Sequence, residues 1–242
     1  MIYDSAQFVF KAPRALSRAR RVLIKPCASY PVPNPVSTGR DIIWEIVRGV
    51  REASEADILI LESAANGGAI YPIYQALSYE FPRVLMLDVN DSIQVEVDNP
   101  LPKPFAVETF WMPNVILSSD YSISVTPAKI IKNVPQFTIM NLISLLPTGK
   151  YSSKKTGPWG NLYGLGINQV AADLYFTLPF DLGIIDATQR FNGTDPVHGK
   201  IDDFGKIFIG DPYEVDVEAA QNMGLTAEYL NLIKAAKVES GV

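Results

Sequence analysis

The chain of 242 residues contains one cysteine, Cys27, and one histidine, His198. A single cysteine excludes a disulfide within the chain and an iron–sulfur cluster held by four of its own thiolates. A structural zinc ion needs four Cys or His ligands, so that kind of site is excluded as well. We therefore expect no iron–sulfur cluster and no structural zinc within this chain.

Long apolar runs and an excess of positive charge are also missing. No stretch approaches the roughly 18 consecutive apolar residues of a membrane-spanning helix. The amino-terminal residues contain no basic segment followed by an apolar one, which predicts that there is no signal peptide. The net charge is −5, which does not favour binding to nucleic acid or to an anionic membrane. We expect a cytoplasmic protein with neither of these partners.

Short apolar runs alternate with helix-like stretches along most of the chain. Buried strands are predicted at 21–25, 57–61, 84–87, 121–125, 183–186 and 206–210. Helices are predicted at 42–50, 70–79, 137–146, 167–175, 213–223 and 227–236. Ser37 or Thr38 is expected to cap the first of these helices. Strand, loop and helix in this repeated order predict parallel β–α–β units.

The middle of the chain breaks this pattern. Apolar residues alternate with polar ones at 93–97, and an aromatic-rich stretch at 105–112 follows a proline-rich loop. Both features are typical of antiparallel strands. We expect residues 1–242 to form a single α/β domain, with a mostly parallel, Rossmann-like sheet flanked by helices and a small antiparallel β insertion in the middle.

Polar residues at the ends of the predicted strands indicate where a ligand could bind. In open α/β sheets the ligand lies beyond the carboxyl ends of the strands. Lys25 and Lys129 are expected there and could neutralise a small anionic ligand. The alternative is that these side chains only cap the strands, since neither a Walker A motif nor a GxGxxG turn is present.

Two aspartates each follow an apolar strand near the end of the chain. Asp186 and Asp211 would lie side by side if their strands pair, and one or two carboxylates suffice to bind Mg²⁺. They are our candidate metal ligands and catalytic acids. The alternative for Asp211 is an N-cap of the next helix, with Pro212 at its first position. Asp216, one turn further on, is expected to face the same loop.

The lone histidine and the lone cysteine each allow two interpretations. His198, in a Gly/Pro loop, could act as a general acid or base near neutral pH, or it could be an exposed structural residue. Cys27 could act as a nucleophile in its thiolate form, or it could be a thiol without a chemical role.

An ordered series of short motifs resembles the domain-of-unknown-function family 362 over roughly residues 21–230. The motifs are Val22–Pro26, Ser122–Lys129, Asn141–Pro147, Leu182–Ala187, Gly193–Gly199 and Gly210–Asp216. We expect one small anionic ligand to be surrounded by residues of these motifs, which are Lys25, Lys129, Asn141, Asp186, the loop from Gly193 to Gly199, Asp211 and Asp216. Members often occur beside ferredoxin-type iron–sulfur modules, which implies a ferredoxin-like redox protein as a partner.

The chain departs from the family pattern at five positions, which are Cys27, Ile130, Ile131, Met140 and Ser144. Several polar groups of the shared pocket are therefore replaced. One hypothesis is a site for a small anionic ligand, assisted by Mg²⁺. This hypothesis leaves open whether the chain is an enzyme. The other is a non-catalytic subunit or partner of an iron–sulfur redox protein, with the aromatic segment 105–111 at the interface. A homo-oligomer is compatible with both.

Overall fold

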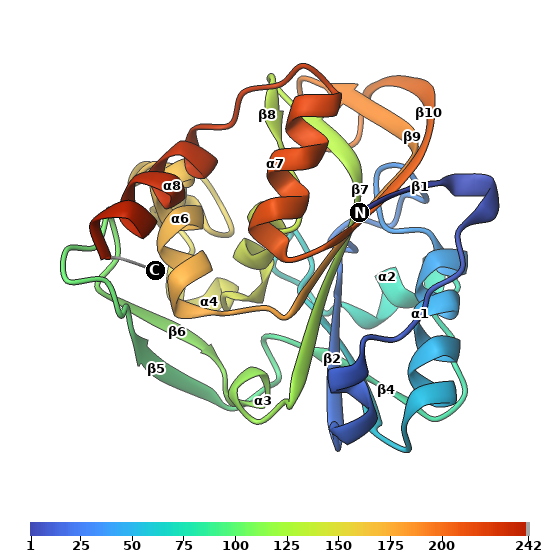
Figure 1. Ribbon diagram of the computed structural model, residues 1–242. Coiled ribbons are helices and arrows are strands. Elements are labelled where there is room, and N and C mark those ends of the chain that lie inside the picture. Colours follow the sequence, from blue (N-terminus) through green and yellow to red (C-terminus); the bar gives the residue numbers. More distant parts are fainter. Residues whose placement is uncertain (241–242) are drawn as a thin grey trace.

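The computed structural model describes residues 1–240 of the chain and is built around one large sheet (Figure 1). Its strand order is β1-β10-β9-β7-β2-β3-β4, with the short strand β8 paired to β7. The bounds are β1 Ile2–Asp4, β2 Arg21–Pro26, β3 Asp57–Glu62, β4 Val84–Asp88, β7 Tyr121–Ile131, β8 Val134–Pro135, β9 Leu182–Gly193 and β10 Gly199–Gly210.

Strands β9, β7, β2, β3 and β4 run parallel, which confirms the predicted α/β fold with a mostly parallel sheet. Strands β10 and β1 run antiparallel to their neighbours. β9 and β10 are longer than the sequence suggested and form a hairpin whose turn contains residues 194–198. The carboxyl end of β10 therefore lies at the end of the sheet where the parallel strands begin, whereas their carboxyl ends lie at the other end.

Helices cover both faces of the sheet (Figure 1). On one face lie α1 Arg40–Ala53 and α2 Tyr71–Ala76, and on the other lie α6 Ile167–Thr177, α7 Pro212–Asn222 and α8 Glu228–Ser240. Successive strand residues point to opposite faces, so Ile58 and Ile60 of β3 belong to the core under α1. Leu59 and Leu61 belong to the second core, under the carboxyl-terminal helices. The remaining short helices are η1 Ser5–Gln7, η2 Arg14–Arg18, α3 Asn114–Leu117, η3 Met140–Leu145, α4 Thr148–Tyr151 and α5 Gly160–Gly164.

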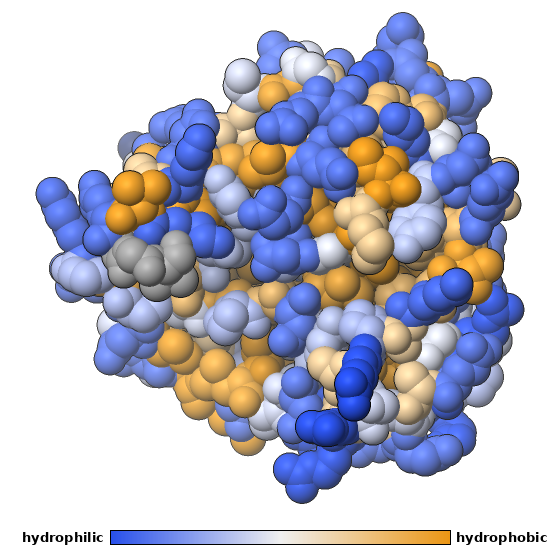
Figure 2. Space-filling model, viewed as in Figure 1, coloured by the Kyte–Doolittle hydropathy of each residue, from blue (hydrophilic) through white to orange (hydrophobic). Residues whose placement is uncertain are grey.

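The predicted antiparallel insertion is present as a separate two-stranded sheet. Strands β5 Gln94–Asp98 and β6 Thr109–Pro113 pair with each other and not with the large sheet. Asp173 of α6 holds the preceding loop because its buried carboxylate accepts hydrogen bonds from the backbone N–H groups of residues 105–107. Figure 2 shows apolar side chains gathered at the surface over this small sheet. In segment 105–111, Val107 and Phe110 are buried, so only part of the expected interface segment faces outward.

Two local predictions were wrong. The first helix begins at Arg40 with Gly39 as its N-cap, and no side chain caps it. The hydroxyl of Thr38 instead accepts a hydrogen bond from Cys27 N and donates one to Val125 O, because tertiary contacts to β7 compete for it. The stretch 137–146 contains only the 3₁₀ helix η3. Among the described residues, no helix has the length and apolar character needed to cross a bilayer.

Candidate functional site

Lys25 lies at the carboxyl end of β2, and it is completely buried. Its Nζ donates to Glu62 Oε2 at 2.8 Å, to Pro26 O at 2.7 Å and to Asn141 Oδ1 at 3.1 Å. An ammonium group has three N–H donors, so all of them are used within the protein. Lys25 was predicted to bind the ligand, but it has no free N–H group to offer one.

Glu62 and Asn141 complete this buried network. Glu62 ends β3 and also accepts hydrogen bonds from Ala28 N at 2.9 Å and Ser63 N at 2.8 Å. The amide of Asn141 donates to Lys25 O at 3.2 Å and to Ser124 Oγ at 3.1 Å. The network therefore ties β2, β3, β7 and η3 together at one point. Asn141 also lines a neighbouring cavity, so its expected role as a ligand contact stays a prediction.

Lys129 of β7 has a different environment. Its side chain is only 3% exposed, and Nζ donates a single hydrogen bond, to Val36 O at 3.0 Å. The rings of Tyr30 and Phe191 lie 5.2 and 5.8 Å from Nζ. Within residues 1–240, no carboxylate lies within 4.0 Å of this ammonium, so it is a buried cation without a counter-ion.

The pKa of Lys129 reflects this environment. Burial lowers the pKa of its ammonium below the ordinary value of 10.5, and the charges of Cys27, Glu62 and Asp195 oppose the shift. Burial also raises the pKa of Tyr30 to about 12, so its phenol stays protonated near neutral pH and can donate a hydrogen bond. The site thus offers a cationic ammonium donor and a neutral phenol donor.

A cavity of about 120 Å³ lies beside Lys129, beyond the carboxyl ends of β2 and β7. Its polar lining includes Cys27, Ser29, Tyr30, Lys129, Gln136 and Ser144. Apolar side chains, including Met140, Ile143 and Trp159, form much of the rest. The predicted location of the ligand site therefore coincides with a cavity in which the buried cation is accessible.

The structure does not bring Asp186 and Asp211 together. Their strands pair, as expected, but in an antiparallel register that places Asp186 opposite Ile207 and Gly183 opposite Gly210. Asp211 therefore follows the Gly183–Gly210 pair, beside the start of β9, whereas Asp186 lies further along β9. There Asp211 accepts hydrogen bonds from Tyr213 N and Glu214 N as the N-cap of α7.

Asp186 stands alone as a metal candidate. It accepts hydrogen bonds from Thr188 N at 3.0 Å and Asn34 Nδ2 at 3.4 Å. Nowhere in the described part of the chain do three His, Cys, Asp or Glu side chains group so that they could hold a metal ion. The carboxylate pair expected for Mg²⁺ is thus not formed.

Asp216 of α7 does not line the cavity, and its side chain is completely buried. Its carboxylate accepts hydrogen bonds from Thr138 Oγ1 at 2.6 Å, Thr138 N at 2.9 Å, Ile139 N at 3.1 Å and Tyr229 OH at 2.9 Å. Burial raises its pKa to about 6, although these hydrogen bonds act in the opposite direction. Asp216 joins α7, α8 and the segment before η3, which is a structural role.

The turn of the β9–β10 hairpin contains the remaining predicted site residues. His198 is exposed, with Nδ1 3.1 Å from Asp195 Oδ1, which also accepts from the backbone N–H of His198. Gly193 and Gly199 pair at the base of the turn, where a Cβ on either would lie within 2.6 Å of a backbone oxygen. The two glycines therefore allow the close backbone approach at the base of the turn. Pro196 is the residue of the hairpin that lines the cavity.

Tyr30 and Gln136 were missed by the sequence analysis. Tyr30 lies in the irregular proline-rich segment after β2, and Gln136 follows the short strand β8. No periodic pattern marks either position. The one indication of the site in the sequence was that Tyr30 is an aromatic residue in the loop directly after a predicted strand.

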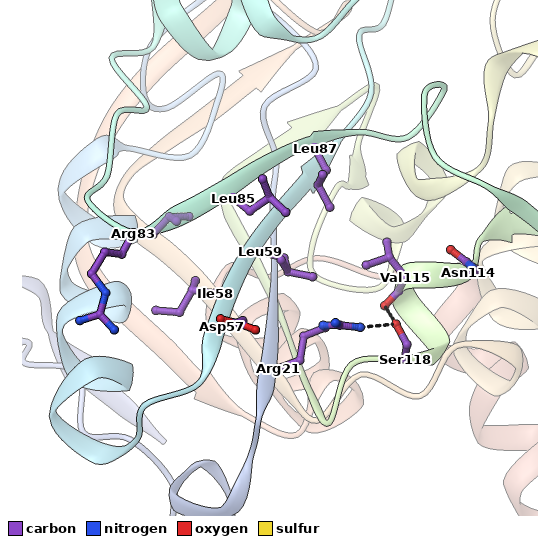
Figure 3. Close-up of a pocket in the computed structure, with 11 residues that line it drawn as sticks. Arg21, Asp57, Ile58, Leu59, Arg83, Leu85, Leu87, Asn114, Val115 and Ser118 are labelled. Atoms are coloured by element: carbon purple, nitrogen blue, oxygen red, sulfur yellow. Dashed lines mark hydrogen bonds between the residues drawn. The ribbon is translucent and has the colours of Figure 1, made fainter.

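A larger cavity lies elsewhere in the described chain, with a volume of about 610 Å³ (Figure 3). It is an open groove near the amino-terminal ends of β2 and β3, floored by Leu59, Leu85 and Val115. Its two arginines already have partners, because Arg21 donates to Ser118 Oγ and Arg83 pairs with Glu55. The smaller cavity, with its unpaired buried cation, is chemically the better candidate.

Residues 22–221 match the family model described as a domain of unknown function (DUF362). The chain belongs to this family. The motif series in the sequence is thereby confirmed as a family resemblance. No curated protein matches the chain.

A solved structure, the lactate racemase apoprotein from Thermoanaerobacterium thermosaccharolyticum, has a similar fold, with a TM-score of 0.54 and 13% sequence identity. The likeness covers 90% of this DUF362 chain and 53% of the racemase chain, so this chain spans about half the length of that protein. At this identity the comparison supports the α/β fold and nothing more about activity.

The contrast between the two buried lysines predicts opposite effects on stability. Lys25→Met leaves Glu62 buried without its partner and should cost about 3–5 kcal/mol. Lys129→Met removes a buried cation that has no counter-ion, so it should change the free energy of unfolding by less than about 1 kcal/mol or increase it. Urea unfolding in a buffer of low anion content measures both. An equally large loss in the two variants would contradict this account.

The raised pKa of Asp216 predicts how stability depends on pH. The group titrates at about 6 in the folded chain and near its ordinary 3.8 when unfolded, so its protonation stabilises the fold at low pH. That contribution is lost as the pH rises through about 6. The stability of the wild type relative to Asp216→Asn should fall by about 2 kcal/mol between about pH 4 and pH 7. Urea midpoints at several pH values measure it, and a constant difference would show that the pKa is not raised.

Proposed function

We propose that the chain binds a small organic anion in the cavity beside Lys129. The observation that carries the proposal is the buried Lys129 ammonium, which has one hydrogen bond and no carboxylate partner within residues 1–240. A buried charge is costly unless it is paired, so the free protein favours a ligand that supplies the missing negative charge. Tyr30, whose phenol stays protonated, lines the same cavity and can donate to the anion.

The size of the cavity restricts the ligand. A cavity of about 150 Å³ accommodates benzene, so a cavity of about 120 Å³ suits a ligand of roughly six non-hydrogen atoms or fewer. A nucleotide or a phosphosugar is too large to enter as a whole. The lactate racemase of similar fold has, by its name, a substrate of this size and charge. We therefore favour short carboxylates over phosphorylated ligands.

The proposed binding step needs no Mg²⁺, because Lys129 neutralises the anion and Asp186 and Asp211 lie apart. Binding is the proposed function, and catalytic turnover would be a further property of the same cavity. Lys25 and Asn141 position its wall, while Lys129 and Tyr30 contact the ligand.

The second candidate function is that of a non-catalytic subunit or partner of an iron–sulfur redox protein. It is supported by the apolar surface over the β5–β6 sheet (Figure 2), near which Ile93 is 73% exposed. It predicts binding of a ferredoxin-like protein without any effect of small anions.

Thermal unfolding in the presence of acetate, glycolate, lactate, phosphate and AMP tests the first proposal. A short carboxylate at about 100 times its Kd should add about 2.7 kcal/mol, which raises Tm by roughly 5–10 °C in a chain of this size. Phosphate and AMP should give smaller shifts, because the cavity is small and mostly apolar.

Two variants make this test specific. Lys129→Met should abolish the shift, because Lys129 is the only cation among the described residues that line the cavity. Lys132→Met is the matched control, since it removes an exposed lysine three positions further along the chain and should keep the full shift. The same shift in Lys129→Met as in the wild type, or no shift with any carboxylate, would refute the proposal.

A further inference from the structure

Cys27 occupies a fixed position at the wall of the cavity. It directly follows β2, and its backbone N–H donates to Val125 O at 2.9 Å and to Thr38 Oγ1 at 2.8 Å. Its carbonyl accepts from Thr38 N at 2.8 Å. Backbone hydrogen bonds on both sides thus hold the residue, while its partly exposed side chain lines the cavity.

The thiol of Cys27 is a close neighbour of the Lys129 ammonium. Both groups approach the same carbonyl oxygen, Val36 O, at 4.0 Å from Cys27 Sγ and 3.0 Å from Lys129 Nζ. A nucleophilic sulfur and an unpaired cation therefore lie in one cavity of about 120 Å³.

We propose that Cys27 and Lys129 form a covalent capture site for short 2-oxo carboxylates, with Lys129 binding the carboxylate and Cys27 adding to the adjacent carbonyl carbon. This inference rests on the anion site proposed above and names its ligand class. In a 2-oxo acid the carbonyl carbon is bonded directly to the carboxylate carbon. A ligand held through its carboxylate by Lys129 thus presents that carbon to the neighbouring thiol.

The addition is balanced without any other reactant. A bond forms between Cys27 Sγ and the carbonyl carbon, the π bond of the carbonyl opens, and the thiol proton ends on the carbonyl oxygen. The product is a hemithioacetal, nothing is oxidised or reduced, and the step is reversible. Tyr30 lines the same cavity and can donate a hydrogen bond to the oxygen as negative charge develops on it.

Glyoxylate and glycolate provide a matched pair of probes, because they have almost the same size and charge but only glyoxylate contains a carbonyl carbon that a thiol can attack. Isothermal titration of the wild type should give a Kd for glyoxylate at least about tenfold lower than that for glycolate. Cys27→Ser should bind both with similar affinity, since its hydroxyl is a weaker nucleophile. Equal affinities in the wild type, or an unchanged preference in Cys27→Ser, would overturn the inference.

Alkylation provides a second, independent measurement. Because the chain has one cysteine, the mass gained on reaction with iodoacetate or iodoacetamide reports on Cys27 alone. The rate ratio of iodoacetate to iodoacetamide should be at least about tenfold higher than the ratio for a free thiol, since Lys129 concentrates the anionic reagent. Lys129→Met should return the ratio to that of the free thiol, and Lys132→Met should not. A ratio equal to that of a free thiol in the wild type, or no alkylation by either reagent, would also overturn the inference.

The outcomes separate the two proposals. Glycolate binding that depends on Lys129, without a preference for glyoxylate, would refute covalent capture and support the anion site. The absence of binding by either acid would refute both proposals.

Discussion

The buried ion pair between Lys25 and Glu62 is the interaction on which the site depends. It joins the carboxyl ends of β2 and β3, and Asn141 connects both strands to η3 and β7. Two buried charges are tolerated at this place because almost every donor and acceptor around them is satisfied. The resulting rigid junction forms the wall beside which the cavity and Lys129 lie. Lys25, which looks like a ligand contact in the sequence, therefore builds the wall of the candidate site instead of facing a ligand.

The same sheet holds a second buried lysine without such compensation. Lys129 has one carbonyl and two aromatic rings around its ammonium, and burial lowers its pKa. The two lysines show why burial alone does not identify a functional group. A paired buried charge is satisfied by the protein, whereas an unpaired one is a reason to look for a ligand. Cys27, which lines the same cavity, adds a nucleophile beside this cation.

Local features of the fold could be predicted from the sequence, and long-range ones could not. The parallel strands follow from apolar runs, and the N-cap at Asp211 follows from the adjacent Pro212, because both depend on neighbours in the chain. The direction of β10 and the burial of Asp216 depend on residues far away in the sequence. For the same reason the sequence predicts a candidate site at the strand ends but does not distinguish the surroundings of Lys25 from those of Lys129, or indicate Tyr30.

The most direct test of the account is the titration of the Lys129 side chain itself, followed by NMR of the chain labelled at lysine Cε and assigned with Lys129→Met. We predict that its pKa lies below the ordinary 10.5 in the free protein and rises when glycolate binds, because the carboxylate stabilises the charged form. A Lys129 pKa that has the ordinary value and does not change with glycolate would contradict the claim that Lys129 is a buried cation without a counter-ion that binds an anion.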